Sequence, residues 1–291
     1  MNCFLLLLPL SLPFQDEAPT VKIVSWNVEN FFDVWDDPYR RDEITTPRFT
    51  TESRRARLAQ VLRVLDADVV CLQEVENRFL LQAWVEEFLP DAGYEVVLLE
   101  GNDSRGIDVA LLSRIPVGEV STFRHLRFQD AAGHEQRFRR DLLRVSLYEP
   151  FMGDIYVVHL KSQHGGEQAD LVRESEARAI AEVISGARKR RPGIRAIVAG
   201  DFNEIPEEKT MQVLFDSGLI DACAGTESVT YNREPYLSRI DYLLLTPALA
   251  EVLIEASVVT ALPNIKLEEI ADHFPVVGVF GGEPGRTMRR R

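Results

Sequence analysis

The chain has 291 residues, of which 45% are hydrophobic, so it can bury a sizeable core and does not have the composition of a disordered protein. Acidic residues number 46 against 33 basic ones, which gives a formal charge of −13. Such a surface repels nucleic acid and anionic membranes on average, so a polyanionic substrate requires a local basic patch or bound cations.

The N-terminus begins with an apolar run at residues 3–12, CFLLLLPLSL. This run resembles the apolar part of a secretory signal, although no Lys or Arg precedes it and Pro9 interrupts it. It is too short to cross a bilayer as a helix. We therefore expect residues 1–19 to be a signal peptide or a disordered N-terminus, residues 20–281 to form the domain, and residues 282–291 to be a polar tail. The expected location is periplasmic or extracellular, with the cytoplasm as the alternative.

The first half of the domain alternates apolar strands with amphipathic helices. Residues 52–65 place leucine and valine at helical spacing, and Thr50 or Thr51 can cap this helix. A long polar loop at 33–51 precedes it, and long ordered loops are often functional. The pattern predicts a second helix at 78–89 and four strands, at 21–27, 68–74, 94–100 and 107–113.

The second half continues the alternation, with helices predicted at 167–190 and 206–217 and strands at 154–161, 194–201, 239–246 and 274–280. Continuous apolar strands are covered on both faces, and their ends are where a scaffold presents chemical groups. Four of the strands carry a polar group at or near one end: Asn27, Glu74, His159 and Asp201. Because all four carry metal-binding or acid–base groups, the pattern indicates one shared site.

Seven short segments carry most of this chemistry. In chain order they are residues 25–30 (SWNVEN), 72–75 (LQEV), 105–110 (RGIDVA), 159–162 (HLKS), 200–203 (GDFN), 238–242 (SRIDY) and 271–275 (ADHFP). Together they resemble the endonuclease/exonuclease/phosphatase superfamily, which is deoxyribonuclease I-like, and within it a bacterial endonuclease-type subgroup that is often exported. The resemblance implies an α/β (α+β) four-layer α/β/β/α sandwich, in which two mixed β-sheets pack face to face with helices outside.

The resemblance also implies a metal site. Asn27 and Glu74 match the positions that bind the metal in this superfamily, and Asp272, which with His273 matches its terminal Asp-His pair, is expected as a further metal ligand. Their chemistry agrees, because a hard cation held by oxygen ligands neutralises the charge that develops on phosphate oxygens. The expected cofactor is Mg²⁺, with Mn²⁺ or Ca²⁺ as alternatives.

The resemblance further implies the catalytic groups. Asp201 and Asn203 match the pair that holds the nucleophilic water and the phosphate, and Asp241 matches the carboxylate that orients His273. His159 matches the histidine that many members place opposite the last one. Hydrolysis needs a base for water and an acid for the leaving oxygen, and a histidine beside a carboxylate suits either role.

Basic residues near these motifs are candidates for binding the substrate phosphate. They are Lys161, Arg105 and Arg140, with Arg137 and Arg139 as further members of a clamp. The alternatives are an exposed lysine at a strand end and a solvated basic strand. Asp108 has two interpretations, either to orient His159 or to brace the loop before it.

Three functions are compatible with these residues. The favoured hypothesis is a nuclease with little base preference, because backbone contacts carry no sequence information. The alternative is a phosphodiesterase or phosphatase for a lipid or small-molecule phosphate, similar to a sphingomyelinase or an inositol phosphate phosphatase. A non-catalytic binding module is disfavoured, since every core position is present. The expected partner is nucleic acid or another phosphodiester; we expect no stable protein partner, no transmembrane segment and a monomer.

Overall fold

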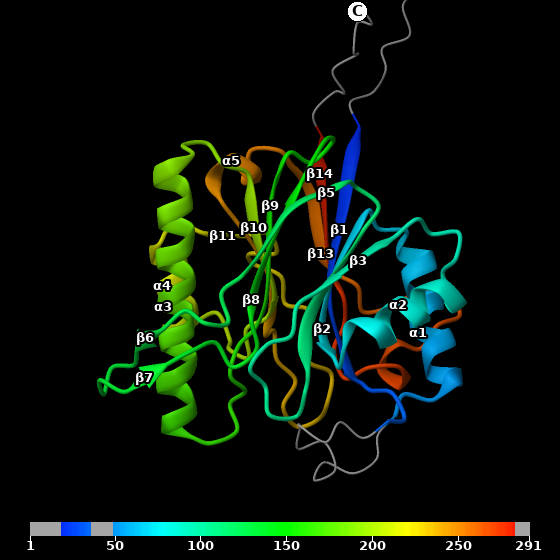
Figure 1. The fold of residues 1–291 in the computed structure, drawn as a ribbon, viewed down its shortest axis with the longest axis horizontal. Helices are drawn as coiled ribbons and strands as arrows, with labels where there is room; N and C mark the ends of the chain where they lie inside the picture. Colours follow the sequence, from blue (N-terminus) through cyan, green and yellow to red (C-terminus); the bar gives the residue numbers. More distant parts are fainter. Residues whose placement is uncertain (1–18, 36–48, 283–291) are drawn as a thin grey trace, which may run out of the picture.

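The computed structural model describes residues 19–35 and 49–282. The segment interpreted as a signal peptide, loop residues 36–48 and tail residues 283–291 lie outside the described residues. Within the described part, two six-stranded mixed sheets pack face to face, with helices on both outer faces (Figure 1). This arrangement confirms the four-layer sandwich predicted from the sequence.

The first sheet has the strand order β13-β14-β1-β2-β4-β3. Its strands are β1 (Thr20–Phe31), β2 (Val69–Val75), β3 (Glu95–Leu98), β4 (Asp108–Ser113), β13 (Leu253–Val258) and β14 (Val276–Gly281). Strands β1 and β2 are parallel, whereas β14 and β4 run antiparallel to them on either side. Helices α1 (Glu52–Leu65) and α2 (Arg78–Phe88) cover the outer face of this sheet.

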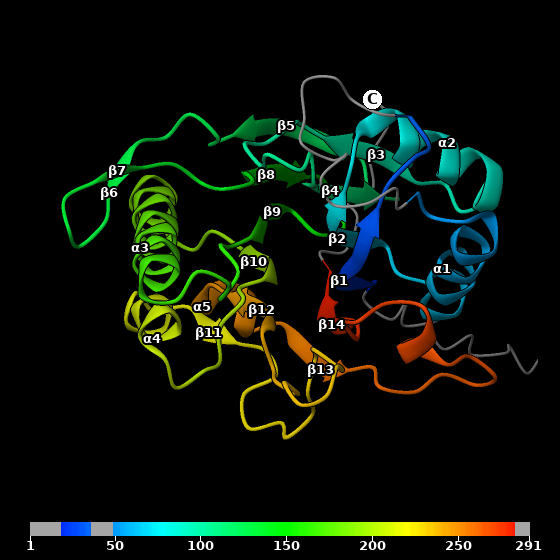
Figure 2. The same ribbon diagram turned by 90° about the horizontal axis from the view of Figure 1, so that it is seen from below.

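The second sheet has the strand order β11-β12-β10-β9-β8-β5. Its strands are β5 (Val117–Thr122), β8 (Leu142–Leu147), β9 (Gly153–His159), β10 (Ala196–Asp201), β11 (Ile220–Asp221) and β12 (Asp241–Leu245). Strands β9 and β10 are parallel, and β12 and β8 flank them in antiparallel. Helices α3 (Glu167–Arg190) and α4 (Lys209–Asp216) cover the outer face (Figure 2).

Short elements complete the described fold: the hairpin β6 (Phe128–Gln129) and β7 (Glu135–Gln136), helix α5 (Pro247–Ala250) and the 3₁₀ helix η2 (Leu267–Glu269). Among the described residues, no helix is both long enough and apolar enough to cross a membrane.

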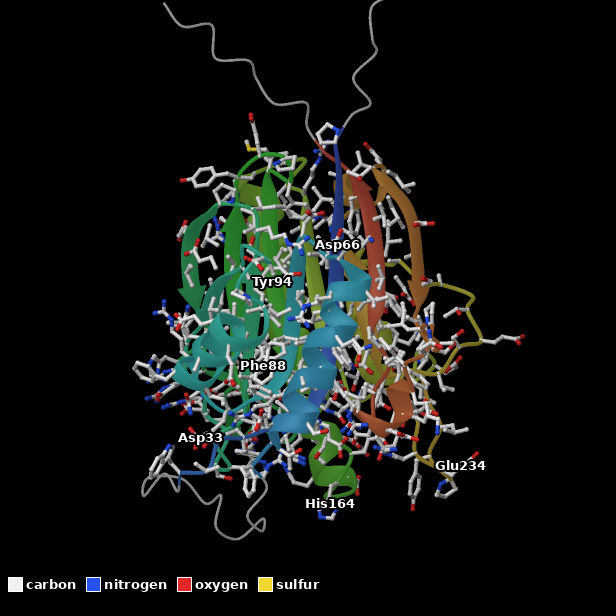
Figure 3. The ribbon with its side chains drawn as sticks, turned by 90° about the vertical axis from the view of Figure 1, so that its right-hand side faces the viewer. Asp33, Asp66, Phe88, Tyr94, His164 and Glu234 are labelled. Atoms are coloured by element: carbon white, nitrogen blue, oxygen red, sulfur yellow. The ribbon has the colours of Figure 1, made fainter. Side chains whose placement is uncertain are left out.

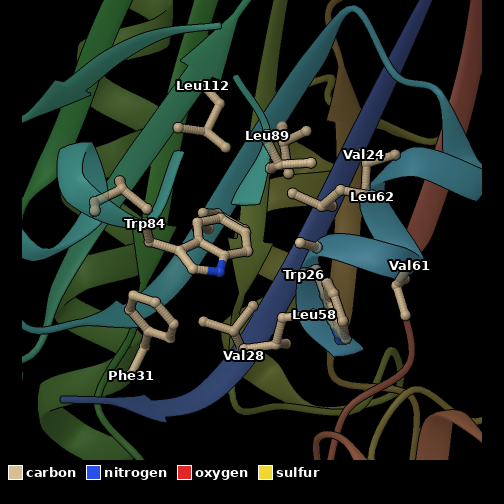
Figure 4. Close-up of a cluster of buried hydrophobic side chains, with 14 of the residues drawn as sticks. Val24, Trp26, Val28, Phe31, Leu58, Val61, Leu62, Trp84, Leu89 and Leu112 are labelled. Atoms are coloured by element: carbon tan, nitrogen blue, oxygen red, sulfur yellow. The ribbon is translucent and has the colours of Figure 1, made fainter. Parts of the chain in front are cut away.

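Apolar side chains form a layer between the sheets and one under each pair of helices. Under α1 and α2, Trp84 packs edge-on against Phe31 with ring centroids 5.3 Å apart, beside Trp26 and Leu62 (Figure 4). The layer between the sheets draws residues from both, including Ile23 of the first sheet and Leu243 of the second. Burying both faces of each sheet supplies the main stabilisation of the fold, and it explains why the strands read as continuous apolar runs.

The alternation of side chains decides where the polar strand ends point. Successive residues of a strand face opposite sides of the sheet. In β9, Ile155 and Val157 lie in the layer between the sheets, and His159 continues the same parity. In β10, Ile197 and Ala199 also lie in the layer between the sheets, and Asp201, two residues after Ala199, points to the same face. The polar groups therefore extend the inter-sheet layer at one end of the sandwich.

Some predicted boundaries differ from the structure. Strand β1 continues to Phe31, four residues beyond the predicted end, and helix α4 begins at Lys209, three residues after the predicted start. The sequence analysis also missed β5, β8 and β13, together with the two-residue strands β6, β7 and β11. Strand β5 and strand β13 are sheet edges with mixed exposure, so they lack the apolar run that marked the central strands.

Candidate active site

The polar strand ends meet because of strand direction. The parallel strands β1 and β2 end at one edge of the first sheet, and β9 and β10 end at one edge of the second. The antiparallel neighbours β12 and β14 begin at those edges. In the register of the second sheet, Asp201 lies directly between His159 on one side and Asp241 on the other. Three predicted site residues therefore form one row across three strands.

These residues surround a cavity of about 1100 Å³. Figure 3 shows His164, which lines the cavity, at the same end of the molecule as Asp33 and Glu234, while Asp66 lies toward the other end. The predicted site residues on its wall are Glu74, Arg105, Arg140, His159, Lys161, Asp201, Asn203, Asp272 and His273. Asn27 and Asp241 are buried directly behind this wall and bond to residues on it.

His273 and Asp241 form a buried pair. The distance from Nδ1 of His273 to Oδ2 of Asp241 is 2.7 Å, and both side chains are at most 5% exposed. Burial alone lowers the pKa of His273, but the charges of Asp241 and Asp201 outweigh it and raise the pKa well above its ordinary value. Because Nδ1 of His273 is hydrogen-bonded to Asp241, Nε2 is the ring nitrogen that remains available to a ligand in the cavity.

Asp201 lies at the centre of the site. Its Oδ2 accepts a hydrogen bond of 3.0 Å from Nδ2 of Asn27, lies 3.4 Å from Nε2 of His159 and lies 3.8 Å from Nε2 of His273. Burial, together with the charge of Asp241, raises the pKa of Asp201. Its Oδ1 accepts the backbone N–H of Asn203 at 2.8 Å. This hydrogen bond to Asp201 stabilises the left-handed backbone conformation of Asn203, which has φ 53°.

Glu74 owes its position to irregular strands. The pairing of β1 with β2 shifts register after Asn27, and the pairing of β2 with β4 shifts at Glu74, which has φ 65°. Bulges of this kind redirect side chains next to functional sites. The Glu74 carboxylate accepts from the backbone N–H of Asn30 at 2.8 Å and from Nδ2 of Asn27 at 3.4 Å. Asn27 thus turns its amino group toward the carboxylates, and its direct coordination of a metal stays a prediction.

Carboxylates crowd together beside Glu74. Burial raises the pKa of Asp272 to about 6; nearby His273 lowers it, whereas the charges of Glu29 and Glu74 raise it further. A divalent cation would relieve this repulsion, and carboxylate oxygens are its preferred ligands. The residues present therefore fit a hard metal at Glu74 and Asp272.

A second cluster, formed by Asp201, Asp241 and His273, also brings three donor atoms within 4.8 Å of one another. The 2.7 Å bond between His273 and Asp241 already occupies Nδ1. We therefore interpret this cluster as acid–base machinery, and a metal at Glu74 and Asp272 stays a prediction.

His159 lies opposite His273 across Asp201, and its environment differs. Burial lowers its pKa well below the ordinary value, and the positive charges of Arg140 and Arg105 lower it further. Its Nδ1 has no hydrogen-bond partner among the described residues. Asp108 accepts the backbone N–H of Gly101 at 2.7 Å, which supports the interpretation that it braces the loop.

The basic candidates divide into two groups. Arg105, Arg140 and Lys161 line the cavity, and so does Arg139. Arg137 instead lines a neighbouring pocket of about 310 Å³, which Arg139 also lines and the catalytic residues do not. The structure therefore places four of the five clamp candidates around the site and leaves Arg137 outside it.

The sequence analysis missed two tyrosines and two residues that position the site. Tyr231 lies edge-on to the ring of His273, with centroids 5.2 Å apart, and Tyr236 is 72% exposed at the cavity mouth. The hydroxyl of buried Thr230 accepts the backbone N–H of Asp241 at 3.0 Å. Arg54 of α1 donates to the carbonyl oxygens of Glu29 and Ile270, at 2.7 and 2.8 Å. Residues 230–236 carry no periodic pattern, so no sequence signal marked them.

Comparisons with known proteins agree with this geometry. The sequence matches the Endonuclease/Exonuclease/phosphatase family over residues 22–229. Protein YbhP of Escherichia coli K12 is 26% identical over 252 residues, which cover 78% of this chain and 90% of YbhP.

Two solved structures show the same fold with different named activities. A mannosyl-6-phosphatase from Bacteroides thetaiotaomicron has a TM-score of 0.62 and 19% identity, and the match covers 89% of this chain and 98% of that one. A 3′ phosphatase from Neisseria, bound to a product DNA hairpin, has a TM-score of 0.57 and 20% identity, and the match covers 89% and 99%. At such identities the likeness shows the fold and leaves the substrate open.

Proposed function

The chain belongs to the endonuclease/exonuclease/phosphatase family, whose enzymes hydrolyse phosphoester bonds with a divalent metal, and we propose that it is a nuclease with little base preference. The observation that carries the proposal is the composition of one cavity. Two histidines in opposite electrostatic environments flank Asp201, and the same cavity is lined by carboxylates and by four basic side chains.

The two histidines support separate acid and base roles. The charge of Asp241 at 2.7 Å keeps His273 protonated near neutral pH, so His273 is suited to stabilise a phosphoryl oxygen or to protonate the leaving oxygen. His159 has arginines near it and a lowered pKa, so it is neutral and suited to accept a proton from water. Environments that push two pKa values apart are a general sign of paired acid and base groups.

The remaining residues position the reactants. Asp201 lies between the histidines, and Asn203 lines the same cavity next to it, where the two can orient a water molecule and a phosphate oxygen. Glu74 and Asp272 would hold the metal, which supplies Lewis-acid stabilisation of the phosphate charge when it is bound. Mg²⁺ is the proposed ion because the ligands are hard oxygen donors.

The four basic residues that line the cavity favour nucleic acid over a neutral lipid headgroup as the substrate; they are Arg105, Arg139, Arg140 and Lys161. A chain with a formal charge of −13 repels a polyanion on average. Four basic side chains gathered at one cavity would offset this repulsion locally and attract a polyanionic substrate. The phosphatase alternative keeps the same catalytic residues and differs only in what occupies the rest of the cavity. Export to the periplasm or the outside stays a proposal.

One parallel assay tests the proposal. The purified protein is incubated with Mg²⁺ or Mn²⁺ and offered plasmid DNA, RNA, sphingomyelin, a sugar phosphate and a chromogenic phosphodiester. The matched control is His273→Ala purified in the same way, which separates this activity from a contaminant. Cleavage of DNA or RNA by the wild type alone supports the nuclease. Cleavage of the lipid or sugar phosphate with neither nucleic acid cut would make the phosphatase alternative correct.

A further inference from the structure

The cavity is lined by charged side chains of both signs. Glu74, Asp201 and Asp272 are acidic members of the lining. The basic wall, which we define as Arg105, Arg139, Arg140 and Lys161, lines the same cavity. Asp103 is an acidic member of the lining, and it pairs with both Arg105, at 3.5 Å, and Arg140, at 3.0 Å. Asp103 therefore pairs with two of the four cations, and an anionic ligand would balance the charge of the others.

Arg140 is held rigidly in this wall. Its side chain is 5% exposed, its Nη1 donates to the carbonyl oxygen of Leu160 at 3.1 Å, and its Nε faces Asp103. Among residues 19–35 and 49–282, its buried Nε has no hydrogen bond of good geometry, although Oδ2 of Asp103 lies 3.0 Å away. A guanidinium fixed on two sides and adjoining a cavity is pre-organised to bind a phosphate oxygen.

A buried carboxylate beneath the wall holds two of its members. Glu176 lies in the middle of α3 and is 0% exposed. Its Oε1 accepts the backbone N–H of Arg139, and its Oε2 accepts the backbone N–H of Lys161, both at 2.7 Å. One side chain therefore ties the segment before β8 to the segment after β9. Burying a carboxylate is costly unless it is well bonded, so the position of these two segments is strongly determined.

We propose that the basic wall is a subsite for a second phosphate group, that Glu176 is the positioning residue that holds it, and that the substrate is therefore a phosphoester carrying another phosphate beside the scissile one. This inference rests on the proposed function, because it places the scissile phosphate at Asp201 and the histidines. It adds a requirement that a simple phosphodiesterase does not have. The second phosphate can belong to a nucleic acid strand or to a small bisphosphate, since both present the same anion to the wall.

Two matched substrate pairs test the subsite. The first pair is a dinucleoside monophosphate with and without an added terminal phosphate, and the second is a sugar phosphodiester with and without a second phosphate. The wild type should process the doubly phosphorylated member with a kcat/KM higher by about tenfold or more, as one charge-assisted contact implies. A preference in the nucleotide pair alone identifies a nucleic acid strand, and a preference in both pairs identifies the phosphate itself.

Three variants locate the effect. Arg139→Gln should reduce the preference toward unity, and Arg137→Gln, two residues away and outside the cavity, is the matched control that should keep it. Glu176→Gln replaces one acceptor by a donor opposite a backbone N–H, so it should also reduce the preference, through a raised KM for the doubly phosphorylated member. A loss of activity that is equal for both members of a pair would indicate a merely structural Glu176.

Pyrophosphate binding provides a readout that does not require catalysis. By calorimetry, the wild type and Arg137→Gln should bind pyrophosphate about tenfold or more tightly than Arg139→Gln does. Equal binding by all three proteins, or equal kcat/KM within both substrate pairs, would overturn the subsite. Because binding is measured separately, a failure of the subsite stays distinguishable from a failure of the proposed hydrolase activity, which appears as no turnover of any substrate.

Discussion

Replacing Asp241 by asparagine tests how the catalytic pair works. The substitution keeps the size of the side chain and removes its charge. The carboxylate lies 2.7 Å from Nδ1 of His273, and both groups are almost fully buried. A hydrogen bond to a charged group contributes about 1.5–3 kcal/mol, so losing it should lower the turnover rate by ~10–10²-fold. The physical reason is that a neutral asparagine no longer holds the imidazole in its charged form and orientation.

The informative measurement is a double-mutant cycle. The turnover rate of a chromogenic phosphodiester is measured under metal-replete conditions for Asp241→Asn, for His273→Ala and for the double variant. His273→Ala should lose ~10²-fold or more, as expected for a lost proton-transfer group. Because Asp241 acts through His273, the double variant should be about as active as His273→Ala alone.

The control for this cycle is Asp66→Asn. Asp66 is 71% exposed and lies away from the cavity end, so its loss should leave the turnover rate unchanged. Circular dichroism checks that each variant is folded. Strictly multiplicative losses in the double variant would refute the pairing and would mean that the two residues act independently.

The other predictions concern the second histidine, the metal and the acid stability. His159→Ala should lower the turnover rate by ~10²-fold or more, whereas His134→Ala, whose side chain is 66% exposed, should not; equal rates for both variants would exclude His159 as a base. Excess chelator should abolish activity, and Glu74→Gln should weaken Mg²⁺ binding measured by calorimetry; full activity in chelator would refute the metal site. Asp154 is buried, which favours a raised pKa, but hydrogen bonds from Arg144 and other neighbours hold the pKa below the ordinary value of 3.8. This pair therefore stabilises the fold above about pH 4 and ceases to do so as the pH falls through the folded-state pKa. Denaturant unfolding should show that Asp154→Asn costs about 3–5 kcal/mol at pH 7 and that its difference from the wild type shrinks toward pH 3; a difference independent of pH would contradict the assignment.

The sequence alone determined the architecture and most of the candidate site. The central strands are apolar on both faces because each sheet is covered twice, and this pattern is visible without coordinates. The polar groups at the strand ends, such as Glu74 and Asp201, stand out because a buried polar group at the end of an apolar run requires a partner or a function. Helix α3 was predicted at its observed bounds, since its periodic pattern is long.

The tertiary structure decided what depends on contacts between distant segments. The alternation of side chains along each strand directs His159 and Asp201 toward the layer between the sheets. Only the direction and register of β9, β10 and β12 place these two residues in one row with Asp241. Edge strands such as β13 are half exposed, so their composition did not distinguish them from loops.

The basic residues show the same limit. Arg137 and Arg139 are neighbours in a single run, and nothing in their order says which one faces the cavity. The structure places Arg139 on its wall and Arg137 outside it, and it shows Glu176 holding that wall from a helix 37 residues later in the chain. A local pattern records burial and periodicity, whereas the placement of a charge relative to a site arises only when non-local segments pack together.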